Sequence, residues 1–534
     1  MKITSLLLSI ALVLGCRAPE TPAASGPRTP REGPHDGGTL VRRLEADAGT
    51  LNYALQTTDY ERQLLDYIYD PLVALDANLQ PIPATAAKWE VSPDGLTYTF
   101  HLDPRSTFSD GTKVKASDVI FTIMKIVDTP SPQFAGNFEA LDRDHTKAAD
   151  EKTAVVAFRE RRVAQIYAFN IGVLPEHVYG KGDFKKDFAD VAVGNGPYRL
   201  ADRKRGATIR LERRSDYWRE KPHLATILFK VIGVHTTAWN AIQHGDVDET
   251  RVKSDQWFFA RNDAALQRKI ELRTLYLLRY NCIPWNLRDP LFGDKRVRKA
   301  LAMLFDRQSI IDNIYHGQAR PITGPFTPDQ WAYNPSVPAI PFDPRGAAAL
   351  LADAGWRDTD GDHVIDRGGR KFSFSMLVPA GDTISFEQAQ VFQDALKNAG
   401  IEMRIEPLDG ATFFKHVMSG DFQAASMAWT LDPFPDIYPL FHSKQRPPAG
   451  LNVVSYANPE IDGLIDQSRT ELNPEKRTAI YRRMHEILAD DQPYLWTVQV
   501  GTKWAINRRV HDVRDSKGFG LFEWYPGPLA WWVK

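Results

Sequence analysis

Residues 429–432, with the sequence Trp-Thr-Leu-Asp, place together two groups that can bind a ligand ammonium. The carboxylate of Asp432 attracts a cation strongly where a cleft holds little water, and the indole of Trp429 adds an apolar surface and cation–π attraction. Pro433 pushes the residue before it into an extended backbone, which fixes Asp432. The sequence is also compatible with two structural roles, in which Asp432 caps the next helix or pairs with an arginine.

Residues 358–366 carry carboxylates at every second or fourth position. A tight loop with this spacing can surround a hard cation such as calcium with oxygen ligands. The candidate ligands are Asp358, Asp360, Asp362 and Asp366. The acidic residue that closes an EF-hand loop is absent because Gly369 takes its place, and a solvated aspartate-rich turn explains the composition equally well. We therefore assign no metal, and calcium bound at this loop would have a structural role.

The sequence lacks the motifs of common hydrolases and nucleotide-binding enzymes. It contains no Gly-x-Ser-x-Gly elbow and no phosphate-binding loop, and His485-Glu486 lacks the second histidine of a zinc protease motif. Carboxylates are plentiful, so no pair of them can be singled out as catalytic without geometry. The sequence therefore favours a protein that is not an enzyme and needs no cofactor.

The composition excludes some classes of partner. The 66 Lys and Arg residues nearly balance the 67 Asp and Glu residues, which argues against a nucleic-acid binder. A hydrophobic content of 43% is typical of a soluble globular protein, and a length of 534 residues favours more than one structural unit, such as two lobes. Of the two cysteines, Cys282 lies in an apolar context that predicts a buried side chain rather than a nucleophile.

Strands and helices alternate in the first half of the chain. Residues 59–72 place apolar side chains on one helical face. Residues 96–102 alternate between apolar and polar types, which predicts a half-buried strand, and residues 119–127 return to helical spacing. This alternation predicts an α/β protein.

The second half contains the clearest supersecondary unit. Residues 371–378 predict a strand, residues 389–399 a helix and residues 401–406 a second strand, as a right-handed parallel crossover requires. Residues 422–428 predict the next, largely buried strand of the same sheet. Open α/β sheets bind ligands beyond the carboxyl ends of their strands, so residues 429–432 would leave this sheet at a ligand-binding edge.

The N-terminus predicts export. Lys2 precedes an apolar run that is too short to span a bilayer, which is typical of a signal peptide. Residues 13–16, Val-Leu-Gly-Cys, resemble a bacterial lipobox, in which the signal is cleaved before the cysteine and the cysteine carries a lipid. We therefore predict a signal peptide at residues 1–15 and lipid attachment at Cys16, and residues 16–38 predict a flexible tether. The alternative is an ordinary secretory signal with a chance cysteine.

A series of segments carries a family resemblance over nearly the whole mature chain. The longest run comprises residues 83–89 (Pro-Ala-Thr-Ala-Ala-Lys-Trp), 92–100 (Ser-Pro-Asp-Gly-Leu-Thr-Tyr-Thr-Phe), 108–112 and 116–119. The shorter segments are residues 49–52, 69–72, 174–177, 194–198, 297–301, 354–356 and 456–462. In this order they resemble the extracytoplasmic solute-binding proteins of peptide and nickel ABC importers, the oligopeptide- and dipeptide-binding family. The acidic turn at residues 358–366 also resembles a recurrent feature of that family.

The resemblance implies an α/β, two-lobed periplasmic-binding-protein fold, class II of the large peptide-binding type, with mixed sheets and a ligand cleft between the lobes. It implies lobe I at residues 39–281 with an inserted subdomain at roughly 70–195, lobe II at 282–498, and a return of residues 499–534 to lobe I. The chain would cross between the lobes near Tyr280 and Asn281 and again near residues 496–502.

The resemblance also implies binding residues. In peptide-binding members the carboxylate of a Trp-x-x-Asp segment receives the amino terminus of the peptide, and Asp432 matches that position, with Trp429 and Thr430 before it. The residues that follow depart from the family, whose members more often have a second acidic residue directly before proline. Gln56 and Thr57 correspond loosely to a ligand-lining stretch, and no arginine lies in a motif that aligns with a partner for the ligand carboxylate.

We therefore predict an exported, periplasmic or cell-surface lipoprotein, anchored to a bacterial membrane through Cys16 and monomeric, that binds peptides for an ABC importer. Its partners would be the permease subunits, the membrane and the peptide, with no nucleic acid. Within the same class, the alternative ligand is an oligosaccharide or another organic solute. Alternatives from other classes are a ligand sensor and a secreted hydrolase.

Overall fold

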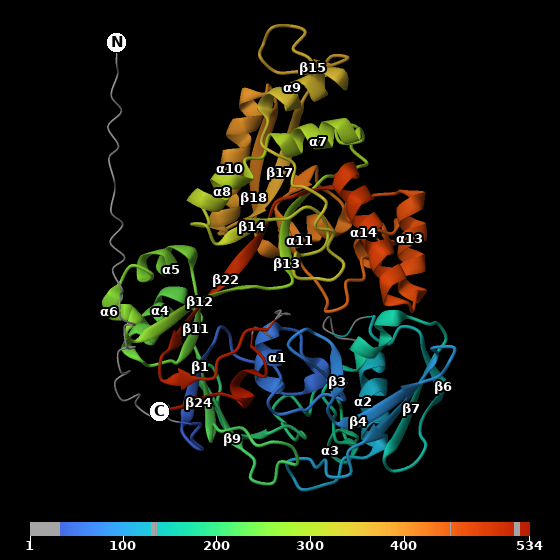
Figure 1. The fold of residues 1–534 in the computed structure, drawn as a ribbon, viewed down its shortest axis with the longest axis vertical. Helices are drawn as coiled ribbons and strands as arrows, with labels where there is room; N and C mark the ends of the chain where they lie inside the picture. The colour runs from blue at the N-terminus through green and yellow to red at the C-terminus, as the bar shows by residue number, and fades with distance from the viewer. Residues whose placement is uncertain (1–32, 130–133, 135, 449, 517–523) are drawn as a thin grey trace, which may run out of the picture.

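The computed structural model describes residues 33–129, 134, 136–448, 450–516 and 524–534, so the predicted lipid site at Cys16 lies outside the described residues. Figure 1 shows two bodies, one above the other. We name the lower body, with the described residues up to 276 and from 501 onward, lobe I, and the upper body, residues 279–498, lobe II. No helix in the described ranges is long and apolar enough to cross a membrane.

A mixed sheet forms the centre of lobe I. Strand β1 (Thr39–Leu44) lies between two parallel neighbours, and the other pairs are antiparallel. In spatial order the strands are β12 (Ile270–Tyr276), β22 (Val498–Asn507), β11 (Glu249–Val252), β1, β10 (Thr226–Val231), β9 (Thr208–Arg213) and β8 (Tyr198–Lys204). The helices beside β11 and β12 are α4 (His235–His244), α5 (Ser254–Ala260) and α6 (Ala264–Gln267).

A smaller antiparallel sheet forms the lower right part of lobe I in Figure 1. Its strands, in spatial order, are β4 (Ala86–Val91), β5 (Thr97–Leu102), β7 (Thr153–Phe158) and β6 (Leu141–Ala148). The predicted alternation is confirmed, because Tyr98, Phe100 and Leu102 are buried while the residues between them are only half-buried. Helix α2 (Ala116–Asp128) packs on β6 and β7 with its buried apolar face, as its spacing predicts.

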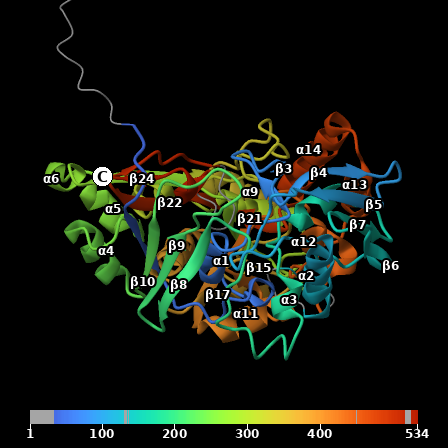
Figure 2. The same ribbon diagram turned by 90° about the horizontal axis from the view of Figure 1, so that it is seen from below.

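Short elements complete lobe I. They are η1 (Tyr53–Leu55), α1 (Asp59–Leu65), β2 (Val73–Leu75), β3 (Pro81–Pro83), η2 (Val163–Phe169), α3 (Glu176–Tyr179), β23 (Val510–His511), η4 (Gly527–Leu529) and β24 (Trp532–Val533). Figure 2, from below, shows β24 and the C-terminus beside β22 on the same side of lobe I.

Helix α1 is shorter than the predicted helix at residues 59–72. It ends at Leu65, and the carbonyls of Tyr67 and Ile68 instead accept hydrogen bonds from the amides of Tyr198 and Gly196. A Cβ at Gly196 would lie 2.7 Å from the backbone of Ile68, so the segment at residues 194–198 needs glycine for this close approach. Pairing with this segment therefore replaces the second half of the predicted helix.

In lobe II, the predicted parallel crossover is confirmed. Strand β17 (Ser373–Pro379) pairs in parallel with β18 (Glu402–Leu408), and α10 (Thr383–Asn398) connects them. Phe392 and Leu396 of α10 are buried in the core, and Gly400, with a φ of +74°, ends the turn after the helix.

The other elements of lobe II surround this unit (Figure 1). They are α7 (Lys295–Met303), α8 (Arg307–Asn313), β14 (Ala319–Pro321), α9 (Pro344–Asp353), β15 (Asp366–Arg367), β16 (Arg370–Lys371), α11 (Gly410–Ser419), α12 (Tyr438–Phe441), η3 (Ser443–Gln445), α13 (Pro459–Thr470) and α14 (Pro474–Asp491).

The predicted strand at residues 422–428 is divided between two sheets, which corrects the sequence prediction. Strand β19 (Ala424–Ala425) pairs in parallel with β17, as expected. After Ser426 the chain leaves that sheet, and β20 (Met427–Thr430) pairs antiparallel with β13 (Arg279–Pro284), which also pairs with β21 (Tyr494–Trp496). This second sheet brings residues 429–432 to the side of lobe II that faces lobe I.

Two segments of the described chain connect the lobes. The chain passes from β12 in the lobe I sheet to β13 in lobe II, and β22 pairs first with β14 and then with β12 and β11 as it returns. The mixed α/β architecture with two lobes therefore confirms the predicted fold class.

Candidate binding site between the lobes

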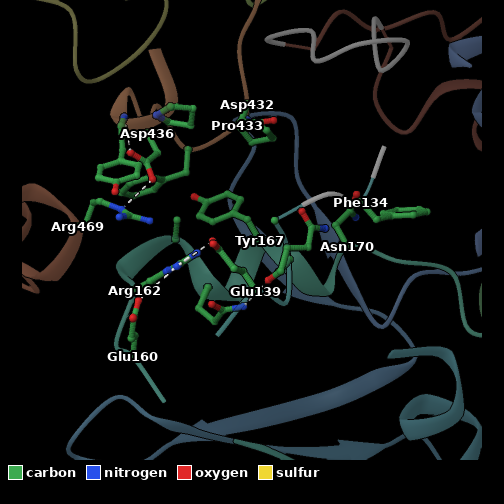
Figure 3. A pocket seen from close by; sticks show the side chains of 18 of the residues that line it. Phe134, Glu139, Glu160, Arg162, Tyr167, Asn170, Asp432, Pro433, Asp436 and Arg469 are labelled. Atoms are coloured by element: carbon green, nitrogen blue, oxygen red, sulfur yellow. Dashed lines mark hydrogen bonds and ion pairs between the residues drawn. The ribbon is translucent and has the colours of Figure 1, made fainter. Parts of the chain in front are cut away.

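A cavity of about 480 Å³ lies between the lobes, and Asp432 lines it (Figure 3). Lobe II contributes the segment after β20 and an arginine of α13, and lobe I contributes α1 and the region of η2. Among the lining residues are Arg62, Phe134, Arg162, Tyr167 and Asn170 from lobe I, and Asp432, Phe434, Asp436 and Arg469 from lobe II. The cavity is thus formed by residues far apart in the sequence.

The backbone holds Asp432 at the end of the β13–β20 ladder. The amide of Leu431 donates to the carbonyl of Leu278 at 2.7 Å, and Pro433 follows directly. Among the described residues, the Asp432 carboxylate has no hydrogen-bond donor and no ion-pair partner, although water reaches it from the cleft. A carboxylate with this geometry is available to a cationic group of a ligand.

The environment of Asp432 disfavours its charged form. Loss of hydration between the lobes, with a smaller contribution from the Asp436 carboxylate, raises the pKa of Asp432 to about 6, and the positive charge of Arg62 opposes the shift. Since the side chain remains open to the cleft, the cause is enclosure by both lobes rather than burial in a core. An incoming ammonium would supply the missing positive charge.

The structural roles that the sequence left open for Asp432 belong to Asp436. Its carboxylate accepts from the amide of Tyr438 at 2.9 Å at the start of α12, and it forms an ion pair with Arg469 at 3.1 Å, drawn in Figure 3. The guanidinium of Arg469 also lies over the ring of Tyr438, 4.2 Å from its centroid. Asp436 is therefore committed within lobe II, whereas Asp432 is not.

Trp429 and Thr430 lie on β20 and do not line this cavity. The indole of Trp429 packs against the core of lobe II, and its nitrogen lies beside the hydroxyl of Tyr494. Thr430 is exposed and stands opposite Arg279 on β13. Of the predicted segment, Asp432 alone lines the cavity.

Gln56 and Thr57 belong to a loop that Glu61 holds in place. Gln56 is fully buried beside the hydroxyl of Tyr53, and the amide of Thr57 donates to Glu61 at 2.7 Å. Glu61 accepts three further backbone amides, from residues 49, 50 and 58. Residues 56 and 57 therefore have a structural role in this structure, in a loop that is attached to the cavity-lining helix α1.

Three of the four aspartates of the acidic loop come together. Ligand atoms of Asp358, Asp360 and Asp362 all lie within 4.8 Å of one another at the surface. The ammonium of Lys371 contacts Asp360 at 2.6 Å and Asp362 at 2.8 Å. Asp366 is buried and accepts instead from the amide and hydroxyl of Thr359. A lysine thus already supplies positive charge to this cluster.

Sequence reasoning missed most of the lobe I wall. Arg62, Tyr167 and Asn170 occur in no recognisable motif and reach the site only through the fold. Arg62 donates to the side-chain carbonyl of Asn170 at 2.9 Å, which ties α1 to the end of η2. The predicted burial of Cys282 is confirmed, and burial raises the pKa of its thiol well above the usual range.

Known proteins resemble the chain in sequence and in fold. The sequence profile described as "Bacterial extracellular solute-binding proteins, family 5 Middle" matches residues 80–448. Oligopeptide-binding protein AppA of Bacillus subtilis is 28% identical over 98% of this chain and 97% of its own length. Protein XP55 of Streptomyces lividans is 29% identical over 89% of this chain and 86% of its own length.

Solved structures extend this likeness. The structure of AppA from Bacillus subtilis in complex with a nonapeptide has a TM-score of 0.77 at 27% identity and covers 94% of this chain and 100% of AppA. NikA from Brucella suis in complex with Fe(III)-EDTA shares the fold, with a TM-score of 0.83 at 20% identity over 93% of this chain and all of NikA. The family profile covers more than half of the chain, and the chain therefore belongs to family 5 of the bacterial extracellular solute-binding proteins.

Proposed function

We propose that the protein is the substrate-binding receptor of a peptide ABC importer, and that Asp432 receives the amino terminus of the bound peptide. The Asp432 carboxylate lines the interlobe cavity without an ion-pair partner among the described residues, and it carries this proposal. The peptide named in the AppA complex, in a relative that matches nearly the whole chain, supports the same ligand class. The protein would act by enclosing its ligand rather than by transforming it.

We also propose the topology of the whole receptor. The chain would be exported by residues 1–15 and anchored through a lipid on Cys16, with residues 16–38 as a tether. Lobe I would comprise residues 39–281 with a subdomain at roughly 70–195, lobe II residues 282–498, and residues 499–534 would rejoin lobe I. A tether keeps the receptor near its permease and raises the local concentration of loaded receptor there.

The ligand that co-purifies with the protein tests the proposal. We expect mass spectrometry of the material released on denaturation to identify peptides with free amino termini. Oligosaccharides or another organic solute in their place would assign the receptor a different ligand class and contradict the proposed role of Asp432.

A further inference from the structure

The end of lobe I that contains α4, α5 and α6 is rich in positive charge. Residues 251–269, which include α5 and α6, contain five Lys or Arg residues and two Asp residues, in a chain whose formal net charge is -1. Figures 1 and 2 both show these helices and the C-terminus at the same end of lobe I. The excess of positive charge is therefore local to this end.

Hydrogen bonds hold four basic residues on adjoining segments of this end. The side chain of Arg508, just after β22, donates to the carbonyl of Gln267 at 2.6 Å, and the amide of Arg508 donates to the carbonyl of Lys269 at 2.9 Å. The side-chain amide of Gln267 donates to the carbonyl of Arg261. We name Arg261, Arg268, Lys269 and Arg508 the basic cluster; all four are exposed and form no ion pair among the described residues.

Aromatic rings of α5 adjoin the basic cluster. Phe259 is 72% exposed, and the centroid of its ring lies 5.7 Å from that of Phe258. The guanidinium of Arg261 lies 4.4 Å from the ring centroid of Phe258 and 5.6 Å from that of Trp257. A single exposed ring needs no partner, but Phe and Trp beside Lys and Arg are the combination that binds the interface of a lipid bilayer.

The carboxylates near the basic cluster do not neutralise it. Asp263 caps α6 by accepting two backbone amides at 2.9 Å, and Glu271 pairs with Arg273 at 2.7 Å. Asp255 lies at the other end of α5, where it lines a cavity together with residues of lobe II. The basic cluster therefore retains an excess of positive charge.

The first described residues of the chain lie at the same end of lobe I. The ring of His35 contacts that of Trp532 on β24, with centroids 5.1 Å apart. After β24, the amide of Lys534 donates to the carbonyl of Arg509, the residue that follows Arg508. Direct contacts therefore connect the start of the described chain with the basic cluster, and the proposed lipid anchor would hold this end of lobe I near a bilayer.

We propose that the basic cluster and Phe259 bind the surface of a bilayer that contains anionic phospholipids. The positive charges would lie at the lipid phosphates, and Phe259 would enter the boundary between headgroups and acyl chains. This inference goes beyond the proposed peptide receptor, and it uses the proposed anchor only for nearness to the membrane. A flexible tether does not orient the receptor, whereas this surface would determine which side of lobe I faces the bilayer.

Flotation with lipid vesicles tests the proposal. The protein is the chain from residue 17 onward, which contains every described residue and lacks the predicted lipid, and the vesicles are phosphatidylcholine with or without phosphatidylglycerol. We expect binding only to vesicles with phosphatidylglycerol, and loss of this binding in about 0.5 M salt, because salt screens surface charge. The double variant Arg268→Gln and Lys269→Gln should bind about 25-fold more weakly, at roughly fivefold for each charge, and Phe259→Ser about fivefold more weakly.

Matched controls lie in lobe II. The double variant Arg404→Gln and Lys415→Gln removes two exposed positive charges, and Phe414→Ser removes a ring that is 61% exposed, so both should bind vesicles as the wild type does. Absence of binding by the wild type, equal binding to phosphatidylcholine alone, or an equal loss in the controls would overturn the proposal.

Peptide binding by the same proteins separates this proposal from the proposed function. The lobe I variants should keep the peptide affinity of the wild type, because their side chains lie outside the cavity of Asp432. A wild type that binds peptides but no vesicles would contradict the membrane contact alone, and one that binds vesicles but no peptide would contradict the proposed function alone.

Discussion

The ring of Tyr167 in lobe I lies 5.8 Å, between centroids, from the ring of Phe434 in lobe II. Both residues line the cavity of Asp432, and Phe434 also packs against Trp331 with centroids 5.7 Å apart. This aromatic contact joins the lobes at the edge of the candidate site. Separation of the lobes would break this contact. The contact should therefore favour a closed form, in which the two lobes lie against each other.

Removal of the aromatic contact should shift the receptor toward an open form. An aromatic pair contributes roughly 0.5–1.5 kcal/mol, so we expect Tyr167→Ala to weaken ligand binding by about two- to tenfold. Because Tyr167 also lines the cavity, its removal could weaken binding by loss of a ligand contact alone. Small-angle scattering of the ligand-free variant therefore measures opening of the lobes directly. A radius of gyration unchanged from that of the wild type would contradict this role, and Phe414→Ala, at a ring that is 61% exposed, is the control.

Binding of free-amine peptides should depend on pH through Asp432. The ionised carboxylate binds the ammonium, and loss of hydration raises the pKa of Asp432 to about 6, so protonation competes with the ligand as the pH falls. We expect the affinity to fall by about tenfold between pH 7 and pH 5, a range in which the peptide amine stays protonated. Calorimetry across this range checks the prediction, and Asp432→Asn should show a flat profile. A flat profile in the wild type would exclude Asp432 as the partner of the amine.

Glu61 should be essential for the stability of lobe I. Its side chain is 3% exposed and accepts four backbone amides of the loop at residues 49–58, so Glu61→Ala removes the acceptor of four partly buried donors. We expect the free energy of unfolding, measured in urea, to fall by about 3 kcal/mol or more. Glu90→Ala, at an exposed side chain on β4, should change it little. An equal effect of both variants would show that the loop does not depend on Glu61.

Lys371 should decide whether the acidic loop responds to calcium. Its ammonium lies between Asp360 and Asp362, so Lys371→Met leaves carboxylates that repel one another. We expect a small decrease in Tm that millimolar calcium reverses in the variant, whereas calcium leaves the Tm of the wild type unchanged. A calcium-dependent Tm increase in the wild type would instead indicate a metal site that competes with the lysine.

The sequence predicted elements that depend on local patterns. The crossover around α10 and the alternation in β5 follow from side-chain periodicity, and both are present in the structure. The predicted strand at residues 422–428 was wrong in extent because a short buried run contains no signal for the turn at Ser426, where the chain changes sheets. The length of α1 was overestimated because pairing with residues 194–198 is a tertiary effect.

The candidate site was predicted only in part, for a similar reason. Asp432 could be singled out because its neighbours Trp429 and Pro433 mark the segment in sequence. Arg62 and Tyr167 could not, because no residue type or spacing marks them and they reach the cavity only through the fold. Gln56 lies in a stretch that resembles a ligand-lining segment of the family, yet its side chain is buried in the core. Its burial could not be read from the sequence.

The role of Asp432 is tested by the thermal stabilisation of the wild type and Asp432→Asn with one peptide library, prepared with free and with acetylated amino termini. A ligand that binds the folded state raises Tm by mass action. We predict that the free-amine library raises the Tm of the wild type well above the effect of the acetylated library, and that this difference disappears in Asp432→Asn. Equal shifts by both libraries in the wild type, or a shift by oligosaccharides alone, would contradict the assignment of Asp432 as the amine partner of a peptide receptor.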